Sequence, residues 1–300
     1  METAVRDKFL KDSETKTFDP KHRRTINFNI GKYNVAVKNG MHQFADHEGL
    51  RNHIAEIKRL AIKNLDTHLL EYEKNAQAQG VNVLWANDGQ EALQQILRIF
   101  KRKNARLVVK SKSMTTEEVH MNEFLEANGI ESFETDLGEY ILQLAGQKPY
   151  HIVTPAMHMS KDDIAKLFVE KLNIKHTDSA EELVAIARKI MREKYTDADI
   201  GITGGNFLIS DIGGIAITEN EGNGRLSFTF PKVHIAIVGI EKVIPRAADL
   251  NYFWPMLATS GTGQQVTVYN SIITGPRTGN EVDGPEEMFV ILLDNTEPTY

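Results

Sequence analysis

The chain has 300 residues, of which 41% are hydrophobic and 25% charged, with a net charge of -6. This is ordinary globular composition, and the length suffices for one large core or two modest ones. The acidic balance argues against a general nucleic-acid binder, which needs a basic face, but it leaves room for a local basic pocket. The chain has no cysteine, which excludes disulfides and thiolate-ligated zinc or iron–sulfur sites within these residues.

The N-terminus is charged throughout and lacks the apolar stretch of a signal peptide. No window reaches the ~18–20 consecutive apolar residues of a membrane helix, so we expect a cytoplasmic protein. Residues 1–40 have mixed charge and scattered turn residues, and we expect an arm that is partly ordered at most. Such an arm is either a tail or a partner-binding segment. The main domain is expected over 41–296.

Helical and strand-like patterns alternate through the middle of the chain. A helical pattern covers 46–80, and the helices after it are expected at 88–103, 115–129, 160–172 and 179–195. Thr115 and Glu118 have capping-box spacing, which favours a helix start there. The strands between them are expected at 81–86, 106–110, 130–135 and 151–155. This alternation is typical of a mostly parallel sheet flanked by helices, the α/β class.

After residue 199 the pattern changes to short strands separated by glycine-rich turns. We expect strands at 207–210, 214–218, 226–230, 234–238, 265–274 and 288–293, with one helix at 247–258. Closely spaced strands with tight turns indicate antiparallel strands added to the parallel core.

The segment after the expected strand 106–110 carries Lys112 and Ser113. Ligands of parallel sheets bind beyond the carboxyl ends of the strands, where helix N-termini offer free amides to anions. A lysine flanked by hydroxyls suits a carboxylate or a phosphate. The alternative is a solvated loop with a helix cap.

Carboxylates cluster after the next strand, at Glu134, Asp136 and Glu139. They could orient a hydroxyl group, or act as acid and base if one of them is desolvated. Alternatively, Asp136 caps the following helix.

Two glycine-containing segments follow, and neither matches a dinucleotide fingerprint or a P-loop. The first contains Thr203, Gly204 and Asn206, and its glycines favour close backbone approach to a ligand or to a neighbouring strand. The second could bind an anion through its backbone amides and the guanidinium group of its arginine, or it could be a hairpin turn. Its residues are Asn220, Glu221, Gly222, Asn223 and Arg225.

The histidines have no compact metal-ligand spacing, so we expect no metal site, and no nucleophile elbow is present.

Several motifs together resemble the B component of bacterial lactate-utilisation systems, from about Leu50 to Asn295. They are 108–114 (VVKSKSM), 134–139 (ETDLGE), 151–153 (HIV), 201–204 (GITG), 220–223 (NEGN), 238–243 (VGIEKV), 274–277 (TGPR) and 283–287 (DGPEE). The resemblance implies a LUD domain similar in fold to the NagB, RpiA and CoA-transferase group. It also implies a role in oxidising L-lactate to pyruvate with two sister subunits and iron–sulfur clusters. In that family the 4Fe-4S clusters belong to a cysteine-rich region after the LUD domain, so we expect none in this chain.

On this reading the loops form one anion-receiving cleft for a small metabolite. Its carboxylate would be held by Lys112 and Arg225, with amides near Gly204 and Gly222 completing the cleft. Glu134, Asp136 or Glu221 would handle protons. The full binding set is Lys112, Ser113, Thr203, Gly204, Asn206, Asn220, Gly222, Asn223 and Arg225. The expected partners are the sister subunits and the metabolite, with no nucleic acid and no membrane insertion. The alternatives are a non-catalytic scaffold that docks the cluster domain and sister subunits or, more weakly supported, an acyl- or CoA-transferase-like enzyme using Glu219 or Glu221.

Overall fold

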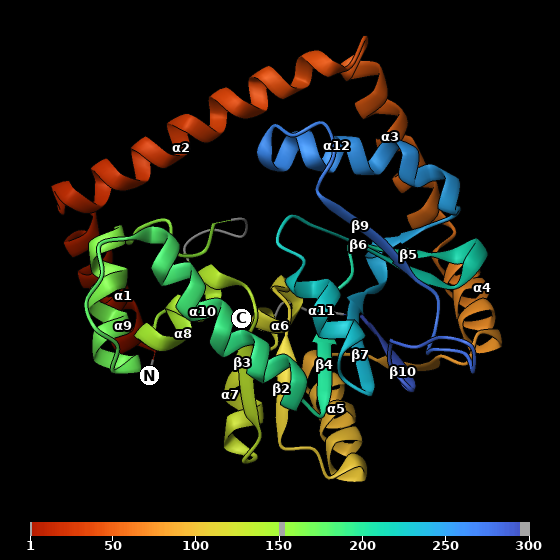
Figure 1. Cartoon of the computed structure of the whole chain (residues 1–300). Coiled ribbons are helices and arrows are strands. Elements are labelled where there is room, and N and C mark those ends of the chain that lie inside the picture. Colours follow the sequence, from red (N-terminus) through yellow and green to blue (C-terminus); the bar gives the residue numbers. More distant parts are fainter. Residues whose placement is uncertain (1, 150–153, 295–300) are drawn as a thin grey trace.

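The computed structural model describes residues 2–149 and 154–294, and its first 40 residues include two helices (Figure 1). These are α1 (Glu2–Thr17) and α2 (Pro20–Gly40), where only an arm was expected from the sequence. The Asp19 side chain caps α2 by accepting from the amides of Lys21 and His22, and Pro20 occupies the first turn. Helix α2 runs along one edge of the molecule (Figure 1).

The elements before residue 150 follow the expected alternation, except that the helices expected over 46–80 and 115–129 are each interrupted, the first at Asn64 and the second at Val119 and His120. After η1 (Met41–Gln43) they are α3 (His47–Lys63), α4 (Leu65–Ala78), β1 (Asn82–Ala86), α5 (Gly89–Lys103), β2 (Leu107–Lys110), α6 (Met114–Glu118), α7 (Met121–Ala127), β3 (Glu131–Glu134) and α8 (Leu137–Ala145).

The second half adds both helices and strands. In order they are α9 (Lys161–Leu172), α10 (Ala180–Asp197), β4 (Ile200–Thr203), β5 (Phe207–Ile209), η2 (Ser210–Ile212), β6 (Gly214–Glu219), α11 (Asn223–Thr229), β7 (Val233–Gly239), η3 (Ile240–Lys242), β8 (Val243–Ile244), η4 (Ala247–Asp249), α12 (Leu250–Thr262), β9 (Tyr269–Ile273) and β10 (Glu287–Leu293). The expected Ser160 cap of α9 is confirmed as a full capping box with Asp163.

Two sheets organise the domain. The main sheet has six parallel strands in the order β1-β10-β7-β4-β2-β3. The second has four strands in the order β8-β5-β6-β9, with antiparallel pairing of β6 to both its neighbours. The expected class is therefore confirmed: an α/β protein with a helix-flanked parallel sheet and added antiparallel strands.

The central strand β7 shows how the main sheet is buried on both faces. Ile235 and Ile237 belong to the apolar cluster that contains residues of α5 and α7. Ala236 and Val238 belong to the opposite cluster, which contains residues of α4 and of the second sheet. All seven residues of β7 are buried, as expected for a parallel strand covered on both sides.

Three local predictions are wrong. Residues 226–230 lie mainly in helix α11, because the backbone at Gly222 (φ +79°) starts a helix instead of closing a hairpin. Residues 200–203 form strand β4, where no strand was expected from the sequence. Thr115 lies inside α6, whose N-cap is Ser113, so the Thr115–Glu118 capping box does not form. Residues 151–153 of the expected strand at 151–155 lie outside the described residues.

Candidate functional site

A pocket of about 710 Å³ lies where the carboxyl ends of strands from both sheets meet. The loops after β2, β4, β6 and β7 contribute its polar lining. Helices α3 and α12 contribute apolar side chains such as Ile54, Phe253 and Leu257. Eight of the twelve residues expected at the site line this pocket: Lys112, Ser113, Asp136, Gly204, Asn206, Asn220, Glu221 and Asn223.

Lys112 and Asp136 form an ion pair on the pocket wall, with 3.3 Å between Nζ and Oδ2. The Asp136 side chain also caps α8, because its Oδ1 accepts from the Glu139 amide at 3.0 Å. The expected capping function is therefore confirmed, and it fixes the carboxylate that orients Lys112. The pair joins the loop after β2 to the loop after β3.

The loop after β4 packs tightly against the loop after β2. A Cβ atom placed on Gly204 would lie 2.6 Å from the Ser113 hydroxyl oxygen, so only glycine fits without movement. The Asn206 side-chain oxygen accepts from the Thr218 amide at 2.9 Å. This hydrogen bond ties the loop to strand β6 and fixes the Asn206 amide group in the pocket wall.

The loop after β6 is built around Glu219, which the expected site set did not include. Its carboxylate accepts from the amides of Gly224 and Arg225 at 2.7 and 2.8 Å, and so caps helix α11. Burial raises the pKa of Glu219, although these two amides oppose the shift. Asn220 exchanges two hydrogen bonds with the Gln264 side chain. The loop is therefore rigidly held, with a partly desolvated carboxylate facing the pocket.

Four expected residues lie outside the described lining of the pocket. Thr203 is fully buried, with its hydroxyl 2.8 Å from His234 Nε2. Gly222 starts α11, and Arg225 stacks over the Tyr269 ring, 5.8 Å from its centroid. Glu134 is paired inside the protein. Arg225 lies outside the pocket because helix α11 starts at residue 223 and directs its side chain towards Tyr269 of β9.

Glu134 belongs to a buried charged cluster that sequence reasoning missed. The ammonium group of Lys110, a fully buried residue, lies 2.9 Å from Glu134 Oε1 and 3.2 Å from Glu117 Oε1. Burial disfavours the Lys110 ammonium, but the charges of Glu134 and Glu117 outweigh it and raise the pKa of Lys110. Burial, reinforced by the charge of Glu134, raises the pKa of Glu139 to about 9. At neutral pH Glu139 is therefore protonated and can donate to Glu134.

Two further lysines line the pocket from distant parts of the chain. Lys58 of α3 donates to the carbonyls of Glu241 and Val243, and burial lowers the pKa of Lys58 to about 8. Lys242 lies in the loop after β7. No local pattern distinguishes Lys58 from the other lysines of its helix. Only the packing of α3 against this loop brings it into the site.

Among the described residues, no group of three or more His, Asp or Glu side chains is placed to hold a metal ion. His234 is fully buried, and burial lowers its pKa to about 3, so it is neutral. The described part of the chain also contains no helix long and apolar enough to cross a membrane.

The architecture is that of an α/β domain with a pocket at the carboxyl ends of its strands. The profile of the LUD domain family matches residues 69–293, so the chain belongs to this family. This confirms the resemblance inferred from the motifs.

Three relatives are similar over most of this chain. It is 44% identical over 249 residues to lactate utilization protein B of Bacillus velezensis, covering 83% of this chain and 52% of that protein. It is 45% identical over 241 residues to lactate utilization protein B of Bacillus subtilis, covering 80% and 50%. It is 41% identical over 248 residues to the uncharacterized electron transport protein YkgF of Escherichia coli, covering 83% and 52%. The chain thus spans about half the length of these relatives.

A crystal structure of a DUF162 family protein from Deinococcus radiodurans also matches, with a TM-score of 0.43 and 14% identity. That match covers 77% of this chain and 98% of the other.

Proposed function

We propose that this chain is the LUD module of a lactate-utilisation protein and that its strand-end pocket binds a small anionic metabolite. In this proposal it contributes to the oxidation of L-lactate to pyruvate together with sister subunits. Two relatives named lactate utilization protein B, each at least 44% identical, support the lactate-utilisation role. Because the chain has no cysteine, 4Fe-4S clusters would be held by cysteines outside it.

The observation that carries the binding proposal is the set of three lysines, Lys58, Lys112 and Lys242, around one pocket. They come from three segments far apart in the sequence, and the fold brings their ammonium groups into one pocket whose lining also contains the carboxylates of Asp136, Glu219, Glu221 and Glu241. A ligand carboxylate gains a charge-assisted hydrogen bond from such an ammonium group, and the gain is larger in a partly dry pocket than in water. The amide of Asn206 and the hydroxyl of Ser113 add neutral donors beside them.

Carboxylates beside the lysines supply the proton chemistry in this proposal. Asp136, Glu219 and Glu221 all line the pocket. Glu219 has a raised pKa because it is buried, so it holds a proton more readily than an exposed glutamate does. In a hydroxy-acid oxidation one of these groups would accept the hydroxyl proton, while the Cα hydrogen and the two electrons of the broken Cα–H bond leave to an acceptor outside this chain.

Isothermal titration calorimetry of the chain with L-lactate, pyruvate and a sugar phosphate tests the proposal. We expect one saturable site for at least one of these anions. Removing a charged hydrogen-bond donor costs about 1.5–3 kcal/mol, so Lys112→Ala should weaken that site by about tenfold to hundredfold. Lys101→Ala, on the exposed last turn of α5, is the matched control and should leave the affinity unchanged. Absence of binding by all three anions would favour the scaffold alternative. Equal affinity in Lys112→Ala would remove this lysine from the site.

A further inference from the structure

Helix α2 has an unusual charge for this chain. Its 21 residues include five lysines and arginines and no aspartate or glutamate, although the net charge of the whole chain is -6. The five are Lys21, Arg23, Arg24, Lys32 and Lys38, and all of them are exposed. None of the residues of α2, all of which the structure describes, is buried. The helix is therefore a positively charged rod on the outside of an acidic protein.

One face of α2 turns towards the protein and the other turns away. The inner face contains half-buried residues at helical spacing, among them Ile26, Ile30 and Val37. The outer face contains Arg24, Phe28, Val35 and Lys38, which lie on one stripe because they are spaced four, seven and three residues apart. Phe28 is 60% exposed and Val35 61% exposed, so the stripe alternates cations with uncovered apolar side chains.

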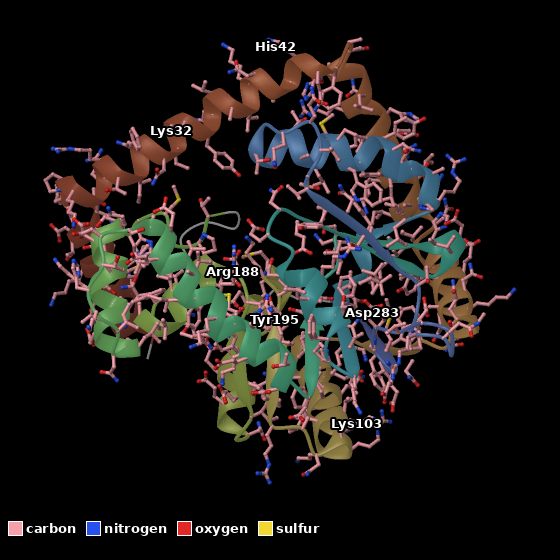
Figure 2. All side chains as sticks on the ribbon, in the orientation of Figure 1. Lys32, His42, Lys103, Arg188, Tyr195 and Asp283 are labelled. Atoms are coloured by element: carbon pink, nitrogen blue, oxygen red, sulfur yellow. The ribbon has the colours of Figure 1, made fainter. Side chains whose placement is uncertain are left out.

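Contacts at both ends of α2 hold it in this orientation. At its C-terminal end, a Cβ atom on Gly40 would lie 2.5 Å from the carbonyl oxygen of Gly263, so the helix packs backbone to backbone beside α12. In its first half, the Asn29 side chain donates to the Met157 carbonyl at 3.0 Å, and Lys21 pairs with Asp163 at 3.5 Å. The helix is about 31 Å long at 1.5 Å per residue, and Figure 2 shows Lys32 and His42 along this outer edge of the molecule.

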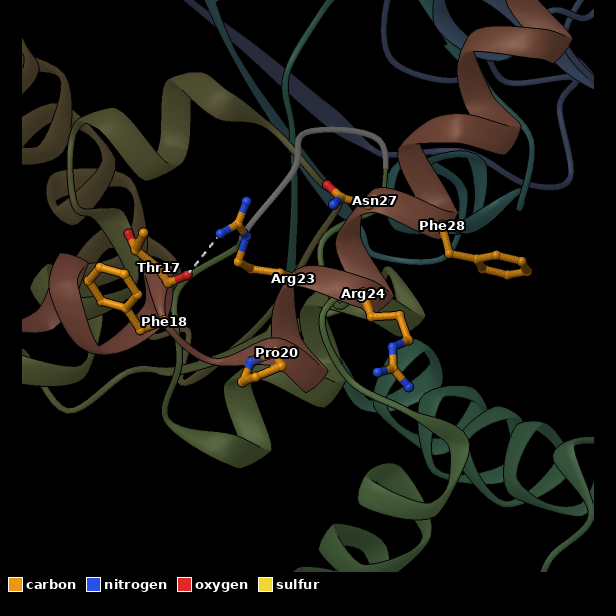
Figure 3. Close-up of a pocket in the computed structure, with 7 residues that line it drawn as sticks. All are labelled: Thr17, Phe18, Pro20, Arg23, Arg24, Asn27 and Phe28. Atoms are coloured by element: carbon orange, nitrogen blue, oxygen red, sulfur yellow. Dashed lines mark hydrogen bonds between the residues drawn. The ribbon is translucent and has the colours of Figure 1, made fainter.

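Exposed cations and aromatic rings also lie together at the corner between α1 and α2. An open hollow of about 760 Å³ lies there, lined by Phe18, Arg23, Arg24 and Phe28 among others (Figure 3). Arg23 reaches back to the Thr17 carbonyl at 3.5 Å. Phe18 is 74% exposed, which places a second uncovered aromatic ring close to the arginines.

We propose that α2 docks this protein onto an anionic lipid surface, lying on it without crossing it. The positive charges along the outward-facing side of α2 are complementary to the phosphate groups of an anionic lipid surface. Phe28, Val35 and Phe18 lie between these charges and enter the boundary between headgroups and acyl chains. An acidic protein partner would satisfy the cations, but cations that alternate with exposed apolar side chains along an outer edge suit a surface that presents phosphate and hydrocarbon together.

Vesicle co-sedimentation tests the proposal. The chain is mixed with vesicles of phosphatidylcholine alone, or with about one third phosphatidylglycerol, at low and at high salt. We expect binding only to the anionic vesicles, and weaker binding at high salt because surface charge is screened. At roughly a fivefold affinity change for each basic residue near the membrane surface, the loss of two cations in Arg24→Glu with Lys38→Glu should weaken binding by about thirtyfold or more.

The matched control reverses Arg98 and Lys101 to glutamate on the exposed side of α5. This double variant changes the net charge equally, but α5 lies at the opposite end of the molecule, where Figure 2 labels Lys103. It should retain the affinity of the parent chain. Circular dichroism of both variants, with an unchanged helical signal, shows that they fold.

A tryptophan at position 28 reports insertion directly. Compared with the parent chain, Phe28→Trp should gain a blue-shifted emission component on anionic vesicles and no such component on phosphatidylcholine. Lack of binding to anionic vesicles overturns the proposal, as does equal loss of binding in the α5 control. Binding of α2 to an acidic protein, without any to vesicles, would replace the lipid surface with that partner.

Discussion

Replacing Lys110 with methionine should destabilise the chain strongly, because it leaves a buried carboxylate without its cation. Lys110 is fully buried and lies 2.9 Å from Glu134 Oε1, and the Glu134 side chain is 4% exposed. Breaking a buried ion pair by removing one partner costs about 3–5 kcal/mol. An exposed pair is worth about 0–1 kcal/mol. Arg59→Met, which breaks the exposed pair with Glu56, is therefore the control.

The free energy of unfolding, measured by urea denaturation at neutral pH, gives the comparison. We expect a loss of about 3–5 kcal/mol for Lys110→Met and less than about 1 kcal/mol for Arg59→Met. Adding Glu134→Gln to Lys110→Met should recover part of the loss, because it removes the uncompensated charge. If Lys110→Met were no more costly than the control, or if the double variant recovered nothing, the reasoning about this cluster would be refuted.

Three further predictions concern the core. His234 has a folded pKa of about 3, below its ordinary value of 6.5, so the unfolded chain binds this proton more readily between those values. The free energy of unfolding should then fall by about 1.4 kcal/mol for each unit by which the pH is lowered in that window. His234→Gln should remove this pH dependence, as measured by urea denaturation at several pH values. The folded pKa of Glu139 is raised to about 9, so its contribution to the free energy of unfolding is complete below its ordinary pKa and is lost as the pH rises through 9. Glu139→Gln should therefore reduce the fall of the unfolding free energy with rising pH. An unchanged pH dependence would contradict the protonated state of Glu139 in the folded protein. In Gly201→Ala the added Cβ would lie 1.7 Å from the Ser227 carbonyl oxygen, and we expect a loss of about 3 kcal/mol or more, whereas Gly261→Ala, with open space around it, should be neutral or stabilising in thermal unfolding.

The sequence predicts the parallel sheet well because its inner strands are buried on both faces. Runs such as that of β7 contain almost only apolar residues, and the helices between the strands have clear amphipathic spacing. Strand β4 was missed because its four residues include Gly201, which looks like a loop residue. The structure explains this glycine, since the backbone of α11 passes directly over it.

The site residues that directly follow strands could be predicted from the sequence, whereas those brought in by helix packing could not. Lys112, Asp136 and Asn206 each follow a strand, so the rule for parallel sheets places them at one edge. Arg225 was expected in the pocket because it follows two glycines. The start of α11 instead directs it onto Tyr269. Lys58 comes from a helix that precedes the whole sheet, so no local pattern connects it with the pocket.

The central claim is that the strand-end pocket receives the metabolite, and hydrogen–deuterium exchange with mass spectrometry tests where binding occurs. The chain is compared with and without saturating L-lactate, and likewise with pyruvate. We expect slower exchange in peptides that cover the pocket loops at 111–114, 204–206 and 218–224. Protection confined to other regions, or unchanged exchange in these loops despite saturable binding, would contradict the account.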